Sequence, residues 1–208
     1  SRIPLSALIG LAFTAAFFLA AILAPWIAPY GLMEIPGKSW EPASSTYLLG
    51  TDKIGRDMLS RMSFGGRTTI FVASMATIVS FVTGSVLGFT AAVLGGWVDQ
   101  VMSRLVDLFM SIPSLILALV VLSVLPTTLP VLILVMGLLD STRVFRLSRA
   151  VAVDITVMDY VEAARLRGER TPWILFREIL PNALPPLVAE LGLRFIFAVL
   201  FISTLSFL

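Results

Sequence analysis

The sequence contains no cysteine and no histidine, and only 13% of its 208 residues are charged. The first two absences exclude Cys or His metal sites, thiol nucleophiles, disulfides and a Ser-His-Asp triad. Soluble domains carry about 25% charged residues, so the shortage of charge and the 58% hydrophobic content indicate an integral membrane protein. The net charge of +2 is too small to suggest a nucleic-acid partner.

Five apolar runs are candidates for membrane-spanning helices, which need about 20 mostly apolar residues. They cover residues 7–28, 68–94, 108–125, 131–145 and 186–208. A signal peptide is the rival interpretation of the first run, but the run is too long and no cleavage site follows it, so we expect a retained span. The second run is rich in small residues that let helices approach closely in lipid, namely Ser80, Gly84, Ser85 and Gly88. The sequence therefore predicts an all-α polytopic membrane protein with about five transmembrane helices, embedded in a lipid bilayer.

Basic residues gather in one loop of this chain. Seven of the fifteen lie between positions 141 and 184, and the positive-inside rule places that loop in the cytoplasm. Three spans separate it from the loop at 29–67, which therefore lies outside, and the N-terminus is cytoplasmic. We expect residues 1–67 to form a transmembrane helix, an external loop and a short gate helix, and residues 68–208 to form the transmembrane core.

A charged segment, 159–181, interrupts the apolar runs and predicts a rigid cytoplasmic hairpin of two short helices. Asp159 is expected to cap the first helix with Glu162 as its reciprocal partner, and Gly168 is expected to end it in a left-handed conformation. The second helix should begin at Thr171, with Pro172 at its first helical position, and should stop at Pro181. Residue chemistry leaves two roles open: a strut docked into another protein, or a connecting loop that binds anionic headgroups.

Three stretches carry a resemblance to a known family. EAARLRG at 162–168, followed by ILP at 179–181, resembles the EAA signature of binding-protein-dependent ABC importer permeases, although Glu178 stands where the family has isoleucine. YLLGTDKIGRDMLSRMSFGGRTTI at 47–70 and GGWVDQVMSRLVDLFMSIPSL at 95–115 resemble blocks of the dipeptide and oligopeptide permeases, specifically their C-type subunit. Members of this family normally have a sixth span after the Leu-Ser-Phe-Leu reached here, so we expect that the last span is missing from this chain by truncation.

The resemblance implies that the hairpin is the coupling helix that inserts into a groove of an ATPase subunit. The residues implied in ATPase coupling are Tyr160, Glu162, Ala163, Ala164, Arg165, Gly168 and Pro181. It also implies alternating-access import of dipeptides, oligopeptides or related small solutes across a prokaryotic inner (plasma) membrane. The implied partners are a second homologous permease in a heterodimer, two ABC ATPase subunits and an extracytoplasmic solute-binding protein.

No phosphate-binding GxxxxGK[ST] loop occurs in the sequence, so ATP and Mg²⁺ would bind to the ATPase partners. We expect the chain itself to bind no cofactor and no metal, and to be a transport subunit without catalytic residues. An intramembrane enzyme is the first rival class. The sequence has no histidine to act as the base of a serine-type site, and Asp140 and Glu190 are the only approximate pair of carboxylates for an aspartyl-type site. A gradient-driven transporter is the second rival, and such proteins usually show inverted repeats and broken helices; no internal repeat is found here.

The block at 47–70 contains turn and capping chemistry. Asp52 or Asp57 can begin a short helix that carries Leu59, Met62 and Phe64. Two interpretations are open: a structural gate helix lying on the outer face, or direct contact with the substrate or its binding protein. The residues expected at this external loop and gate are Gly50, Thr51, Asp52, Gly55, Arg56, Asp57 and Arg61.

Three charged residues lie within or near the predicted spans: Asp140, Glu190 and Arg194. Glu190 and Arg194 are four residues apart, the favourable order for an ion pair on one helix face. We expect all three near the cytoplasmic ends of their spans, where snorkelling and pairing cost little. This favours a structural ion pair, although charged groups within a membrane are functional suspects by default.

Overall fold

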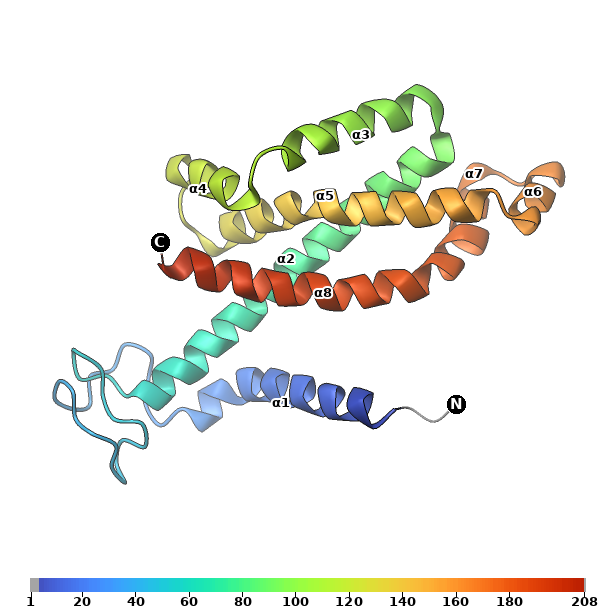
Figure 1. Ribbon diagram of the computed structural model, residues 1–208. Coiled ribbons are helices and arrows are strands. Elements are labelled where there is room, and N and C mark those ends of the chain that lie inside the picture. The colour runs from blue at the N-terminus through green and yellow to red at the C-terminus, as the bar shows by residue number, and fades with distance from the viewer. Residues whose placement is uncertain (1–3, 208) are drawn as a thin grey trace. The chain divides into compact units, whose positions relative to one another are not determined.

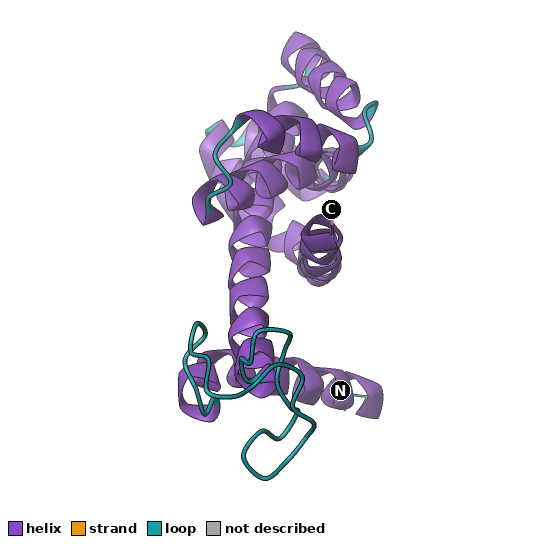
Figure 2. Cartoon of the chain, turned by 90° about the vertical axis from the view of Figure 1, so that its left-hand side faces the viewer, coloured by secondary structure: helices purple, strands orange, loops and turns teal. Residues whose placement is uncertain are grey.

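The computed structural model describes residues 4–207 of the chain (Figure 1). Within that range it contains helices and loops but no strand (Figure 2), which confirms the all-α prediction. The elements are α1 (Leu5–Ile27), α2 (Met58–Leu94), α3 (Gly96–Met110), α4 (Ser114–Val124), α5 (Leu129–Thr156), α6 (Asp159–Leu166), α7 (Thr171–Ile174), the π-helix η1 (Leu175–Ile179) and α8 (Leu180–Phe207).

The chain divides into two compact units, one ending at Phe71 and the other beginning at Val72. The first unit contains α1, the loop 29–57 and the first turns of α2. The second unit contains the rest of α2 and all the later helices. Within it, α5 contacts α3, α4 and α8, so that α5 is the central helix of this unit.

Within residues 4–207, three helical stretches are long and apolar enough to cross a membrane: Leu5–Ile27, Met58–Leu94 and Thr171–Ser206. A fourth is obtained if α3 and α4 together count as one span. The predicted fourth span, 131–145, lies inside α5, whose first 18 residues already include Asp140, Arg143 and Arg146. The expected number of five spans stays a prediction.

The predicted third span, 108–125, is wrong as a single helix. The helix is interrupted between Met110 and Ser114, and the axes of α3 and α4 differ in direction there by 84°. Pro113 explains the break, because proline lacks an amide hydrogen and its ring disfavours a helical conformation for the preceding residue, Ile112.

The predicted short gate helix is also wrong as a separate element. Leu59, Met62 and Phe64 lie in the first two turns of α2, which begins ten residues before the predicted start of the second span. The expected cap is present, because the Asp57 carboxylate accepts hydrogen bonds from the Ser60 amide (2.8 Å) and the Ser60 hydroxyl (2.7 Å). Asp57 therefore starts a long helix.

Small residues bring α2 and α5 into close contact, as the sequence predicted for α2. A Cβ built on Gly84 would lie 2.6 Å from the Ser141 carbonyl oxygen, and one on Gly88 would lie 2.7 Å from the Phe145 carbonyl oxygen. No larger residue fits at either position without moving a backbone. Such contacts replace the hydrophobic effect as a source of helix association in lipid.

The predicted N-caps of both hairpin helices are wrong. Met158, not Asp159, is the N-cap residue of α6, and Arg170, not Thr171, is the N-cap residue of α7; neither helix start has a side-chain cap. Asp159 is instead the first helical residue, where its charge faces the positive end of the helix dipole.

The second helix of the hairpin does not stop at Pro181. It passes through the π-helix η1 into α8, so that α7, η1 and α8 form one continuous helical path. In a regular α-helix the proline ring would collide with a carbonyl of the preceding turn. The wider π-turn immediately before Pro181 relieves this conflict, and the Leu180 amide bonds to the Leu175 carbonyl across it.

Candidate functional site

The C-terminal end of α6 is fixed by backbone geometry. Gly168 adopts a left-handed conformation with φ of +81°, as the sequence predicted. Its amide donates to the Arg165 carbonyl (2.9 Å), and the Glu169 amide donates to the Ala164 carbonyl (3.2 Å). These two bonds form a Schellman motif. A Cβ on Gly168 would meet no atom within 4 Å, so glycine is required here for its conformation and not for space.

One face of α6 is buried in the core of the second unit. Val161 and Ala164 have no exposed surface. They belong to a cluster that also includes residues from α2, α5, α7, η1 and α8. Because several elements contribute to this cluster, the hairpin is held on the helices that precede and follow it by packing.

The opposite face of α6 is exposed. Tyr160, Glu162, Arg165 and Gly168 are exposed, and Ala163 is half-buried. Within the described part of the chain, no charged side chain between positions 159 and 178 makes a hydrogen bond or an ion pair. The predicted coupling set is therefore split by the structure: Ala164 faces inward, Pro181 lies at the exposed start of α8, and the other members face outward.

The loop 29–57 is organised differently, around polar groups that bond to one another. The Asp52 carboxylate accepts hydrogen bonds from the amides of Ile54 (2.9 Å) and Arg56 (3.0 Å). It also pairs with the side chains of Arg56 (2.9 Å) and Arg61 (2.6 Å). Burial alone would raise the pKa of Asp52, but the amides of Arg56 and Ile54 and the Arg56 guanidinium outweigh it and hold this pKa well below its usual range.

Other predicted gate residues serve the same loop. The Thr51 hydroxyl donates to the Lys38 carbonyl (2.6 Å) and accepts from the Glu41 amide (2.8 Å). Gly50 and Gly55 are left-handed, with φ of +75° and +87°. Each residue of the predicted set thus lies in or next to the folded loop, and its contacts supply a structural role; contact with a substrate or a binding protein stays a prediction.

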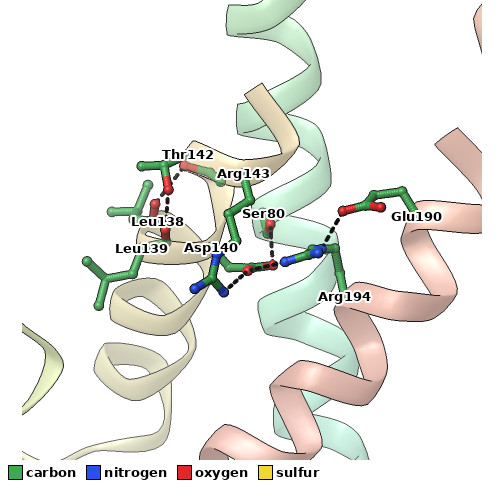
Figure 3. A network of polar contacts seen from close by, with 9 residues as sticks. Ser80, Leu138, Leu139, Asp140, Thr142, Arg143, Glu190 and Arg194 are labelled. Carbon is green, nitrogen blue, oxygen red and sulfur yellow. Dashed lines mark hydrogen bonds and ion pairs between the residues drawn. The ribbon is translucent and has the colours of Figure 1, made fainter. Parts of the chain in front are cut away.

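Charged side chains from two helices, with a serine from a third, meet inside the second unit (Figure 3). Arg194 of α8 donates to Asp140 of α5 (3.1 Å) and forms an ion pair with Glu190 one turn earlier (2.7 Å). The Asp140 carboxylate also accepts from the Ser80 hydroxyl of α2 (3.2 Å) and pairs with Arg143 (3.4 Å). The predicted pair of Glu190 and Arg194 is present, and Asp140 joins it across the helices.

Along the helices this cluster lies near the middle of α5 and α8, and its predicted place at the cytoplasmic ends of the spans stays a prediction. At 1.5 Å per residue, Asp140 lies about 17 Å from the start of α5 and about 24 Å from its end. Arg194 lies about 21 Å from the start of α8 and about 20 Å from its end. The sequence interpretation ended the fourth span at residue 145, whereas the helix α5 continues to Thr156.

A cavity of about 380 Å³ opens beside this cluster, lined by Asp140, Arg143 and Arg194. Its remaining wall is partly apolar, with Phe197 and Met136 among the lining residues. Arg194 stacks over the Phe197 ring at 5.1 Å, a cation–π contact that holds its guanidinium in place. Only 10% of the Arg194 side chain is exposed, against 46% of Arg143, so Arg143 is the freer cation.

Two ion pairs between α3 and α5 were missed by sequence reasoning. Asp99 forms a bidentate pair with Arg149, and Asp107 contacts Arg146 at 2.8 Å. The arginines were counted only as positive-inside charges, although Asp99 and Asp107 were visible in the family block at 95–115. These pairs fasten α3 along α5. Among the described residues, no group of three carboxylates is placed to hold a metal ion.

A helical protein with several membrane-crossing helices and a charged hairpin between two long helices is a polytopic membrane protein. The family model described as binding-protein-dependent transport system inner membrane component matches residues 84–208. The model described as N-terminal TM domain of oligopeptide transport permease C matches residues 6–39. The chain belongs to the family of binding-protein-dependent transport system inner-membrane components.

Named relatives cover nearly the whole chain. The dipeptide transport system permease protein DppC of Haemophilus influenzae is 36% identical over 97% of this chain and 71% of the relative. The di/tripeptide transport system permease protein DppC of Pseudomonas aeruginosa is 33% identical over 97% of this chain and 69% of the relative. The dipeptide transport system permease protein DppC of Escherichia coli K12 is 35% identical over 97% of this chain and 70% of the relative.

Proposed function

We propose that this chain is a membrane-spanning subunit of an ATP-driven importer for dipeptides or oligopeptides, and that the 159–181 hairpin couples it to an ATPase. The substrate class rests on the relatives, which are named as permeases for dipeptides and di/tripeptides. The proposed location is a bacterial inner membrane, because the relatives are bacterial and the chain has several apolar helices. The N-terminus is proposed to be cytoplasmic by the positive-inside rule.

One observation carries the coupling proposal: the hairpin packs inward through apolar side chains while its polar side chains face outward without partners. A rigid element of this kind can transmit force, because its buried face is tied to α5 and α8. Its outward charges, including Glu162 and Arg165, are free to pair with another protein. The hairpin also joins two long helices directly, so that a displacement of α6 would be passed to both.

The partners in this proposal are a second, homologous permease, two ATPase subunits and an extracytoplasmic binding protein. The nucleotide and its Mg²⁺ are assigned to the ATPase subunits, since no phosphate-binding loop occurs in this sequence. In this scheme, ATP-driven closure of the ATPases moves the two coupling hairpins together, and the rigid-body motion of the helices exposes the pore alternately to each side.

The bend between α3 and α4 is a feature that gradient-driven transporters also show. The two mechanisms differ in their energy source. Peptide uptake by the complete transporter in proteoliposomes should require ATP and should continue when ion gradients are collapsed. Uptake that follows a proton or sodium gradient and ignores ATP would overturn the proposal.

Gly168 offers a sharper test of the hairpin as a rigid coupling element. Gly168→Val places a β-branched residue in a left-handed conformation, whereas Gly168→Asn places there a residue that adopts this conformation more readily. Neither Cβ meets an obstacle. We expect the valine variant to import several-fold less peptide per ATP hydrolysed, and the asparagine variant to resemble the wild type. Equal coupling in both variants would contradict the model.

A further inference from the structure

We propose that the cavity beside Asp140 and Arg194 is a subsite for the carboxylate terminus of a peptide in transit, with Arg143 as its cationic anchor. This inference rests on the proposed function. It assigns the cavity a ligand chemistry that the coupling model does not need.

The charges at the cavity leave one guanidinium open to an anion. Two arginines and one aspartate line the cavity, and Glu190 behind Arg194 brings this cluster of four charges to neutrality. The balancing carboxylate, Glu190, pairs with Arg194 but does not line the cavity. Asp140 repels an incoming carboxylate only weakly, because its own charge is already met by Ser80, Arg143 and Arg194.

Arg143 and Arg194 have different roles at the cavity. Arg194 is held by Asp140, Glu190 and the Phe197 ring and is mostly buried, so it is a fixed structural element. Arg143 touches Asp140 only at 3.4 Å, and nearly half of its side chain is exposed. A guanidinium with spare donors recognises a carboxylate through two parallel hydrogen bonds. Arg143 is the group that can change partner when a ligand arrives.

The broken span contributes a second anion-binding feature. Ser114, the first residue of α4, lines the same cavity, and no side chain caps this helix start. The amides of an uncapped first turn carry a partial positive charge and are available to an anion. Transporters with discontinuous helices use such half-helix N-termini to receive anionic substrate groups. This helix start lies directly after the bend at Pro113, and its first residue is part of the cavity lining.

Size and polarity agree with a small peptide. The cavity volume of about 380 Å³ lies within the range of small-ligand sites, roughly 300–1,000 Å³. Phe197, Phe201 and Met136 supply an apolar wall for a peptide side chain.

The test uses the absence of cysteine in this chain. Thr204→Cys places a unique thiol in the cavity lining, and Ser123→Cys places one at an exposed position outside it. The complete transporter in nanodiscs is treated with a small maleimide, and labelling of this chain is followed by mass spectrometry. The probes are a dipeptide with a free carboxylate and the same dipeptide as its C-terminal amide.

We expect the free dipeptide to slow labelling of Thr204→Cys several-fold, and the amide to have much less effect. Adding Arg143→Gln should abolish this protection, and Arg143→Lys should restore part of it. Arg146→Gln, on the same helix but outside the cavity, should leave the protection of Thr204→Cys unchanged. The free dipeptide should not change the rate at which Ser123→Cys is labelled. An unreactive Thr204→Cys would mean that water does not reach the cavity. Equal protection by the free dipeptide and by its C-terminal amide would mean that the cavity does not recognise the carboxylate. Either result overturns the proposal.

Peptide uptake by the same preparation separates this inference from the proposed function. ATP-dependent uptake without protection at Thr204→Cys removes only the subsite. Absence of uptake for every peptide removes the proposed substrate class itself.

Discussion

The loop 29–57 and the 159–181 hairpin are both polar segments between apolar helices, yet they are stabilised in opposite ways. In the loop, charged and hydroxyl groups bond to the loop's own backbone, as Asp52 and Thr51 show. In the hairpin, apolar side chains such as Val161 form the core contact, and the charged groups face outward. Asp52 and Thr51 are satisfied within the loop, although one carboxylate oxygen of Asp57 has no hydrogen-bond partner, whereas the charged side chains of α6 are exposed. The difference supports the proposal that the hairpin is a docking surface.

The two neighbouring alanines of α6 should give the largest effect. Ala164→Glu buries a carboxylate without a partner, which costs about 3–5 kcal/mol, because Ala164 has no exposed surface. Trypsin should then cleave the hairpin at its arginines much faster than in the wild type. Ala163→Glu, at a half-buried position, should leave the cleavage pattern unchanged. Equal sensitivity of both variants would show that the hairpin is not held by this core.

Two left-handed glycines should give an intermediate effect that separates the loop from the hairpin. Alanine in this conformation costs about 1–2 kcal/mol. At Gly55 the new Cβ would also collide with the Gly37 carbonyl, while at Gly168 it would meet nothing. Gly55→Ala should therefore lower the local opening free energy, measured by hydrogen exchange, more than Gly168→Ala does. Similar losses at the two positions would argue against the tight loop described here.

Acid should give the smallest effect, confined to the loop. The pKa of Asp52 is lowered by folding, so its contribution is complete above the unfolded value of about 3.9 and is lost as the pH falls below it. Protection of the Ile54 and Arg56 amides, corrected for intrinsic exchange, should thus be constant from neutral pH to about 4 and then decline. Asp52→Asn should show reduced protection already at neutral pH. A variant with unchanged protection would remove Asp52 from the loop's stability.

Local signals were predicted well from the sequence. Gly168 as a helix end, a helix start at Asp57 (one of two candidates, with Asp52), the small residues of α2 and the pair of Glu190 and Arg194 all depend on residues a few positions apart or on one helix. Apolar content was sufficient to indicate the fold class.

The features that the sequence did not predict depend on how far each helix continues and on which helices contact one another. Pro113 was visible in the sequence, but its position inside an apolar run hid an 84° bend. Pro181 was taken as a stop, because a π-turn before it has no simple sequence signature. Asp140 was assigned to the cytoplasmic end of a span that stops at residue 145, and the sequence did not show that the helix α5 continues through the arginines that follow. The contact between Asp140 and Arg194 joins residues 54 positions apart and could not be derived from periodicity.

The most direct measurement is co-purification of the tagged chain with its partners from native membranes in mild detergent, with ATPase activity measured on the eluate. The wild type should elute with a second permease and with ATPase activity. Ala163→Glu should lose the ATPase subunits while keeping the second permease, and Ala150→Glu, at an exposed position on α5, should keep both. If Ala163→Glu retains full ATPase activity in the eluate, or if the wild type elutes without any, the hairpin is not the coupling element.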